Sequence, residues 1–219
     1  PTTDEVSTML ATAFGGRLYA DPGTSYRYSN INFHLVGLLI EQVTGLPYET
    51  AARTLLLDPL GLTSFRLAVD DANVDGEPWY AVTSNRRYMA MLAAAGAWTA
   101  SASDVARLLD SVNSANVDAD PGRWRPLSSK SMVDMFTPQT PYPANETWDY
   151  GLGVRIFDSG AVGHSGTIES VHTMAVTRPD GLTTVVLVNG AFPEETDDLL
   201  GILFEAELAG RGLVPVAAG

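Results

Sequence analysis

Two segments rich in β-branched residues, 171–177 and 183–189, flank the sequence Arg-Pro-Asp-Gly at 178–181. In such a tight turn the proline presets its own φ and the glycine is free to adopt positive φ. The pattern predicts a β-hairpin, so the end of the chain must build an antiparallel sheet. Residues 161–167 are short enough to supply a third strand, and the amphipathic segment 194–208 predicts a closing helix.

Helix signals dominate the earlier part of the chain. After Asn30, which we interpret as a helix cap, apolar residues recur at helical spacing until Gly45, with Pro47 just beyond. Cap-type residues and prolines predict three more helices, over 47–57, 101–109 and 128–136.

The order of these elements predicts the organisation of the chain. We expect a mainly helical region over 1–140 and an antiparallel-sheet region with its closing helix over 141–219. The fold class is therefore α/β of the α+β type, a small antiparallel sheet with flanking helices plus a helical subdomain. Residues 60–95 follow neither a helical nor a strand pattern clearly.

Composition excludes several classes of partner. The formal charge of −13 argues against nucleic acid and anionic lipid, because both would be repelled. No apolar run approaches the roughly 20 residues of a membrane span, and the absence of cysteine excludes disulfides and thiolate metal sites. A small-molecule or peptide substrate remains as the expected partner, and we expect no cofactor and no metal.

One serine lies in a near match to a nucleophile motif. Gly-His-Ser-Gly-Thr at 163–167 places Ser165 in a sequence close to the Gly-x-Ser-x-Gly elbow, which needs a strand, a strained turn and then a helix. Here another strand follows instead of a helix. The only downstream histidine, His172, is too near in sequence to return as the base of a triad, and Thr167 replaces the final glycine. The motif is therefore interpreted as something other than an elbow.

A second candidate site joins two distant segments, Tyr28-Ser29-Asn30 before a helix and His164-Ser165-Gly166 on a strand. The run PGTSYRYSNINFHLVGLLIEQVTG over 22–45, DPLGL over 58–62, GHSG over 163–166 and the final hairpin closely resemble the class C β-lactamase, D-alanyl-D-alanine carboxypeptidase and esterase family. The resemblance spans nearly the whole chain. It implies the β-lactamase/transpeptidase-like fold and a serine hydrolase that works through an acyl-enzyme.

The resemblance assigns roles to five residues. Acyl transfer needs an activated hydroxyl, a proton carrier and donors for the oxyanion. Tyr28 matches the tyrosine that relays the proton, and His164 takes the catalytic position where β-lactamases tend to have lysine. Asn30 matches the asparagine that binds the substrate amide. Ser165 and Gly166 match the substrate-binding strand, where glycine lets the substrate backbone lie close.

The family's nucleophile, the serine of a Ser-x-x-Lys helix that precedes the tyrosine, has no match. The only lysine is Lys130, which follows Tyr28 and has Leu127 three positions before it. We therefore expect the C-terminal portion of a longer hydrolase, incomplete at its N-terminus and inactive alone. Residues 167–170, Thr-Ile-Glu-Ser, also depart from the glycine-rich stretch common in the family.

The resemblance further implies that strand 183–189 is paired on its far side by strands that precede the nucleophile. Without them it is an exposed apolar edge, so we expect pairing with the missing segment or self-association. An extracytoplasmic location is implied by the resemblance alone. The alternative to a hydrolase is a non-catalytic binding module or pseudoenzyme of the same fold. His34 and His172 are expected to be structural, because no third ligand stands at metal spacing.

Overall fold

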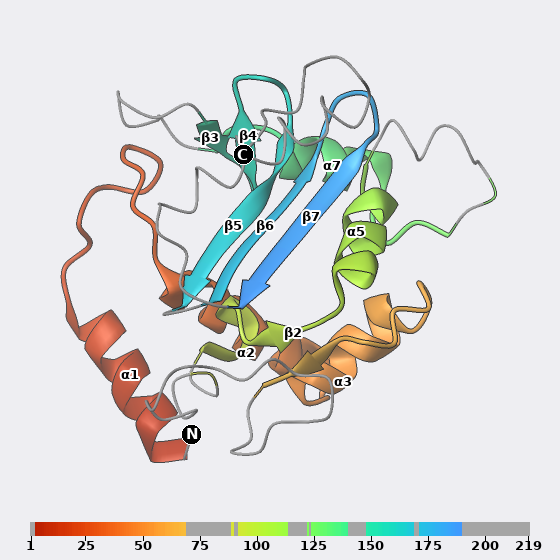
Figure 1. Cartoon of the computed structure of the whole chain (residues 1–219). Helices are drawn as coiled ribbons and strands as arrows, with labels where there is room; N and C mark the ends of the chain where they lie inside the picture. Colours follow the sequence, from red (N-terminus) through yellow and green to blue (C-terminus); the bar gives the residue numbers. More distant parts are fainter. Residues whose placement is uncertain are drawn as a thin grey trace.

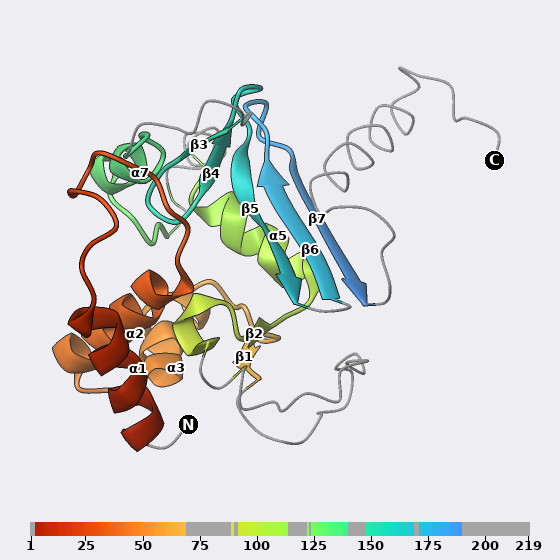
Figure 2. The same ribbon diagram turned by 90° about the vertical axis from the view of Figure 1, so that its left-hand side faces the viewer.

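The computed structural model describes residues 3–68, 89, 92–113, 122, 124–139, 148–168 and 171–189 (Figure 1). Its helices are α1 (Thr3–Gly15), α2 (Asn30–Thr44), α3 (Tyr48–Ala52), the wider helical turn η1 (Arg53–Leu57), the short turn η2 (Ala93–Ala95), α5 (Ala102–Ser111) and α7 (Ser129–Met135). Figure 2 shows α1, α2 and α3 gathered on one side of the strands.

The strands form two antiparallel sheets. In the larger sheet the order is β3-β4-β5-β6-β7, and in the smaller one β1 pairs with β2. The strands are β1 (Arg66–Leu67), β2 (Trp98–Thr99), β3 (Trp148–Tyr150), β4 (Arg155–Phe157), β5 (Val162–Ile168), β6 (Val171–Thr177) and β7 (Thr183–Asn189). The predicted hairpin is confirmed in register, with Thr177 opposite Thr183 and Gly181 at φ 87° in the turn. The expected third strand is β5.

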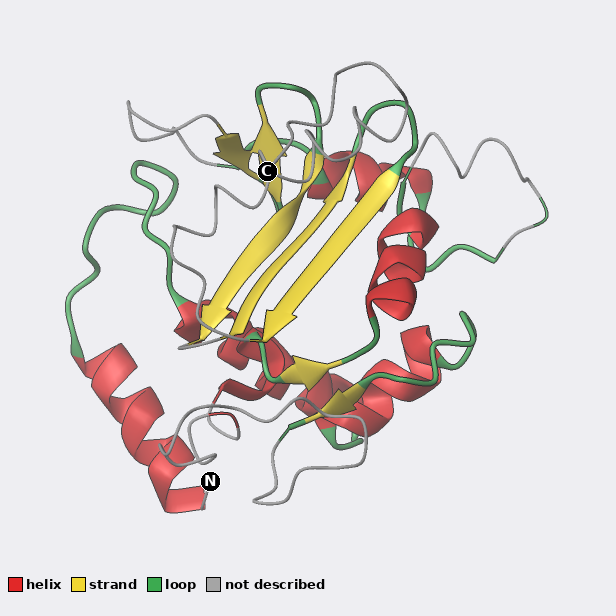
Figure 3. Ribbon diagram, in the orientation of Figure 1, coloured by secondary structure: helices red, strands yellow, loops and turns green. Residues whose placement is uncertain are grey.

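Helix α5 packs against β6 and β7. Figure 3 shows this helix beside the long strands. The core of the sheet region is a cluster of buried side chains from four segments: Trp148, Phe157, Ala161, Met174 and Val176. Alternate residues of β6 supply two of them, because successive side chains of a strand point to opposite faces. The cluster fixes the sheet on which part of the cavity described below is built.

The helix predicted after Asn30 is confirmed, but its cap lies one residue earlier. Ser29 has the extended backbone of an N-cap (φ −154°, ψ 116°), and Asn30 is the first helical residue. The prediction of Asn30 as the cap was wrong because Ser and Asn are both good cap residues and stand side by side. Gly45 ends the helix in the left-handed region, at φ 67°, and its N–H donates to the Glu41 carbonyl.

The three helices predicted over 47–57, 101–109 and 128–136 are confirmed as well. Segment 47–57 is helical from Tyr48 to Leu57, through α3 and η1. The hydroxyl of Ser101 accepts from the Asp104 N–H at the start of α5, and the hydroxyl of Ser128 accepts from the Ser131 N–H at the start of α7. Each bond satisfies an amide that the first helical turn leaves without a partner.

Some predictions lie beyond the described residues. The closing helix over 194–208 is among them, and the division near residue 140 stays a prediction because 140–147 are also outside the described part. Helix α1 and the small sheet were not predicted. In the described part of the chain, no helix has the length and apolarity to cross a membrane.

Candidate active site

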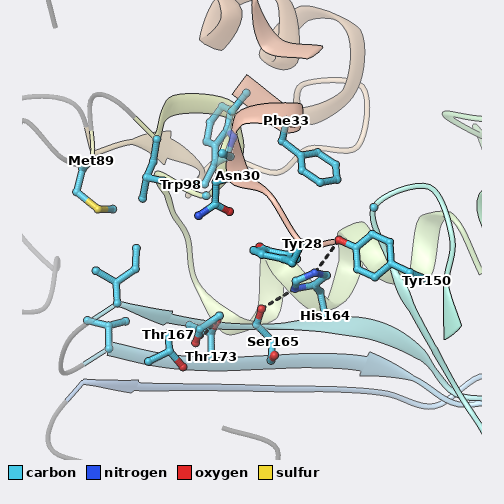
Figure 4. A pocket seen from close by; sticks show the side chains of 18 residues that line it. Tyr28, Asn30, Phe33, Met89, Trp98, Tyr150, His164, Ser165, Thr167 and Thr173 are labelled. Carbon is cyan, nitrogen blue, oxygen red and sulfur yellow. Dashed lines mark hydrogen bonds between the residues drawn. The ribbon is translucent and has the colours of Figure 1, made fainter. Parts of the chain in front are cut away.

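A cavity of about 400 Å³ lies between the N-terminus of α2, the η2–β2 segment and strand β5 (Figure 4). The residues with polar side chains in its lining are Tyr28, Asn30, Tyr150, His164, Ser165, Thr167 and Thr173. The apolar lining residues include Phe33, Met89, Leu92, Trp98, Ile168 and Val171. All five site residues predicted from the sequence line this one cavity.

Tyr28 and His164 come from distant segments and meet here. Tyr28 belongs to the loop that leads into α2, and His164 lies on β5. Their ring centroids are 6.1 Å apart, and Tyr28 is 49% exposed. The phenol therefore stands beside the imidazole and stays accessible to a ligand.

Asn30 reaches the cavity because it opens α2. The first residue of a helix projects its side chain near the helix end, and Figure 4 shows the Asn30 amide above Tyr28. Below it, β5 pairs with β6 along its whole length but with β4 only at Val162 and Gly163. The other edge of Ser165 to Ile168 thus has no strand partner among the described residues.

Gly166 stands opposite Thr173 in the sheet register. A Cβ at position 166 would lie 2.8 Å from Thr173 Oγ1, so any side chain there would push Thr173 aside. Both residues line the cavity. The absence of a side chain at Gly166 thus leaves space for the Thr173 side chain in this part of the cavity lining.

His164 is held on both ring nitrogens. Nδ1 lies 2.5 Å from the Ser165 carbonyl oxygen, and Nε2 lies 3.0 Å from the Tyr150 hydroxyl. Burial lowers the pKa of His164; the bond to the Ser165 carbonyl opposes this, and the positive charge of Arg155 adds to it. The imidazole is therefore neutral near pH 7, and it does not reproduce the charge of the lysine found at this position in β-lactamases.

Tyr150 was missed in the sequence analysis. Burial raises the pKa of its phenol, and the neighbouring Tyr26 and Tyr28 raise it further, so the hydroxyl stays protonated. A signal was present in the sequence: Trp148 and Tyr150 alternate on one strand, directly before a glycine. That pattern places two aromatic rings on one face but does not indicate what they meet.

The remaining histidines are not among the residues that line the cavity. His34 is buried in α2, and its ring nitrogens have no hydrogen-bond partner among the described residues. His172 is buried on β6, with Nδ1 3.5 Å from Thr167 Oγ1. Within the described ranges, no three His, Cys, Asp or Glu side chains gather as a metal site.

The chain has the β-lactamase/transpeptidase-like fold. Its antiparallel sheet is flanked by helices, and a Tyr-Ser-Asn loop faces a His-Ser-Gly strand. A family model described as Beta-lactamase matches residues 4–206. The chain belongs to this family, as its sequence motifs suggested.

Solved structures share the fold at low sequence identity. A D-stereospecific amidohydrolase from Streptomyces sp. is 22% identical with a TM-score of 0.72, over 91% of this chain and 60% of its own. A D-amino acid amidase from Ochrobactrum anthropi SV3 is 19% identical with a TM-score of 0.69, over 94% and 65%. An octameric penicillin-binding protein homologue from Pyrococcus abyssi is 20% identical with a TM-score of 0.73, over 96% and 48%. The chain thus spans between about half and two thirds of these proteins.

Proposed function

We propose that this chain supplies the substrate cleft of a penicillin-recognising-type serine hydrolase, which hydrolyses a peptide, ester or β-lactam carbonyl through an acyl-enzyme. The convergence of Tyr28 and His164 on one cavity is the observation that carries the proposal. The nucleophilic serine comes from a segment outside these 219 residues, since the sequence has no Ser-x-x-Lys.

In this proposal Tyr28 carries the proton. As the phenolate, its accessible side chain takes the proton of the attacking serine, and the resulting phenol returns that proton to the leaving group, while the Asn30 amide donates to the carbonyl of the substrate amide. The substrate backbone lies along the open edge of Ser165 and Gly166, where main-chain groups of β5 are available. His164 forms the wall beside Tyr28. A cation that favours the phenolate must come from beyond the described lining, which holds no Lys or Arg.

Helix α2 supports the idea of a further segment that packs on this chain. Val36, Leu39 and Val43 form one stripe along α2, and they are 49%, 60% and 77% exposed. An apolar stripe of this kind is typical of a helix face that packs against another element. Strand β7 likewise pairs on one side only, with β6, in the described sheet. Both features fit a missing N-terminal part.

For the substrate, we propose that an uncharged amide or ester is the first to test. Two structural relatives are named as an amidohydrolase and an amidase that act on D-configured compounds. The lining of the cavity combines hydrogen-bonding groups with apolar side chains such as Met89, Leu92 and Trp98. A substrate with an apolar substituent next to the reacting carbonyl suits such a mixed lining.

A covalent probe tests the proposal. The natural-length protein and the 219-residue chain are incubated with a fluorophosphonate or a penicillin and then weighed by mass spectrometry. We expect an adduct on the first and none on the second. In the longer protein, Tyr28→Phe slows acylation by about 100-fold or more, as loss of a general base does. Tyr19→Phe, which alters an exposed tyrosine outside the cavity lining, is the matched control.

The second candidate is a binding module or pseudoenzyme, favoured by the absence of the nucleophile motif from these residues. It predicts ligand binding in the cavity without an adduct on either protein. A natural-length protein that binds the probe reversibly and never gains mass would replace the hydrolase proposal with this one.

A further inference from the structure

The hydrogen bonds of His164 define which of its nitrogens carries the proton. The Ser165 carbonyl, 2.5 Å from Nδ1, can only accept, so Nδ1 is protonated. In a neutral ring Nε2 then has only its lone pair, and the Tyr150 hydroxyl at 3.0 Å must donate to it. Figure 4 shows the two bonds on either side of the imidazole.

Tyr150 is fixed by its aromatic neighbours. Its ring lies 5.3 Å from Tyr26 and 6.1 Å from Trp148, and the planes of Tyr150 and His164 are nearly perpendicular at 89°. Rings in tilted and edge-on contact resist reorientation, because each is packed on several sides. The hydroxyl is therefore aimed at Nε2 by the core of the sheet region.

We infer that Tyr150 is a positioning residue that holds His164 in the Nδ1-protonated tautomer with Nε2 already occupied, which leaves Tyr28 as the proton carrier facing the cavity. In this arrangement Nε2 accepts no proton from a substrate or a serine unless Tyr150 first moves. The imidazole then acts through its fixed orientation beside the Tyr28 phenol. The role in catalysis rests on the function proposed above, whereas the tautomer does not.

The surroundings of His164 favour the same neutral ring. Among the described residues, the titratable and charged groups that act on it or contact it are Tyr28 from the loop before α2, Tyr150 from β3 and Arg155 from β4. Arg155 pairs with Tyr150 in the strand register, and its guanidinium lies over the Trp148 ring, 4.4 Å from the centroid. The positive charge of Arg155 disfavours a second positive charge on the imidazole.

Nitrogen-15 spectra of the natural-length protein with labelled histidine measure the tautomer directly. His164→Gln identifies the signals of His164, because they are the ones lost from its spectrum. We expect a protonated Nδ1 and a bare Nε2 at pH 7. In Tyr150→Phe the titration midpoint of His164 rises by about 0.5 to 1 pH unit, because the bond that stabilised the neutral ring is lost.

Tyr26→Phe is the matched control, since it removes one hydroxyl from the same aromatic cluster without touching the bond to His164. In this variant we expect the titration midpoint of His164 to stay at the wild-type value. An Nε2-protonated ring in the wild type, or equal midpoints in Tyr150→Phe and the wild type, overturns the inference. The wild-type tautomer requires no variant, so a Tyr150→Phe protein that fails to fold leaves that measurement decisive.

Kinetics test the positioning role. In the natural-length enzyme, Tyr150→Phe lowers kcat by about 10-fold, as expected for one hydrogen bond, with KM changed less than about threefold. The acid limb of the kcat profile moves to higher pH along with the His164 midpoint. Unchanged kcat and an unchanged profile overturn this role. Because the spectra report the tautomer even in a protein that forms no acyl-enzyme, failure of the proposed function and failure of this inference give different results.

Discussion

The carboxylate of Asp104 accepts two hydrogen bonds from Ser64, one from the main-chain N–H at 3.0 Å and one from the hydroxyl at 2.7 Å. Asp104 lies in the first turn of α5, and Ser64 lies in the segment before β1. Arg107 pairs with the other carboxylate oxygen at 3.1 Å. This nearly buried carboxylate therefore joins the start of α5 to a distant part of the chain.

Asp104→Ala is expected to lower the free energy of unfolding by about 2 kcal/mol, because hydrogen bonds to a charged group are lost and the Ser64 donors are left without their acceptor. Asp104→Asn has a smaller effect, since its amide oxygen can take the place of Oδ2 and still accept from Ser64, while the ion pair with Arg107 is lost. Denaturant titration measures both. Asp134→Ala on α7 is the control, because it removes an exposed carboxylate paired with Lys130, which contributes under about 1 kcal/mol.

The same contact predicts a pH dependence. The bonds from the Ser64 N–H and hydroxyl, with help from Arg107, hold the pKa of Asp104 below its ordinary value. The stabilisation is therefore present above the unfolded-state pKa of about 3.9 and is lost as the pH falls through the folded-state pKa. Asp104→Asn removes this part of the acid sensitivity. A variant whose acid unfolding curve parallels that of the wild type contradicts the prediction.

His164 produces a second pH effect, nearer to neutrality. Burial, partly opposed by the Ser165 carbonyl and aided by Arg155, lowers its pKa in the folded protein. The unfolded chain thus binds this proton more readily, and stability declines as the pH falls from about 6.5 through the folded-state pKa. The difference between the stability curves of the wild type and His164→Gln isolates the effect. A difference that does not vary between about pH 7 and 5 argues against it.

Gly37→Ala is expected to destabilise the helical side of the cavity. A Cβ at position 37 would stand 2.5 Å from the Ala94 Cβ, so α2 and η2 must separate. Overpacking of this kind costs about 1 to 3 kcal/mol, more than the gain of about 1 kcal/mol from replacing a helical glycine. Gly15→Ala, which has nothing within 4 Å, is the control and does not destabilise. Thermal unfolding of the two variants distinguishes the destabilising steric contact at position 37 from the stabilising effect of replacing a helical glycine by alanine.

Strand β7 is expected to drive association of the 219-residue chain. It lies at one end of the described sheet order, and Leu187 is exposed on it. Leu187→Lys places a charge on this edge and lowers the associated fraction seen by light scattering. Val43→Lys, on the exposed stripe of α2, tests the competing surface. A clean monomer in the unmodified chain contradicts the prediction.

The elements that were predicted correctly have ends determined by residues next to them in the sequence. Gly45 adopts positive φ and the turn at 178–181 closes the hairpin, and both depend on residues adjacent in sequence. The small sheet escaped prediction because β1 and β2 have two residues each and pair across some thirty residues. Neither segment carries enough residues for a period to show.

The candidate site divides in the same way. Tyr28, Asn30 and His164 stand in motifs, and the structure gathers them in one cavity. Tyr150 has no motif of its own, because its contact with His164 depends on the β3–β4–β5 register and on the approach of the Tyr26 ring. Such a contact follows from tertiary packing, which no local pattern encodes.

The two edges of β5 are paired to different extents, and this difference offers a way to detect a bound ligand without a covalent reaction. Among the described strands, β4 pairs only with the first two residues of β5, so alternate amides beyond Gly163 point away from β6, and we expect their hydrogens to exchange with solvent faster without a ligand than with one. A molecule lying along that edge slows their exchange. Deuterium uptake at this strand therefore reports occupancy even in a chain that never forms a covalent intermediate.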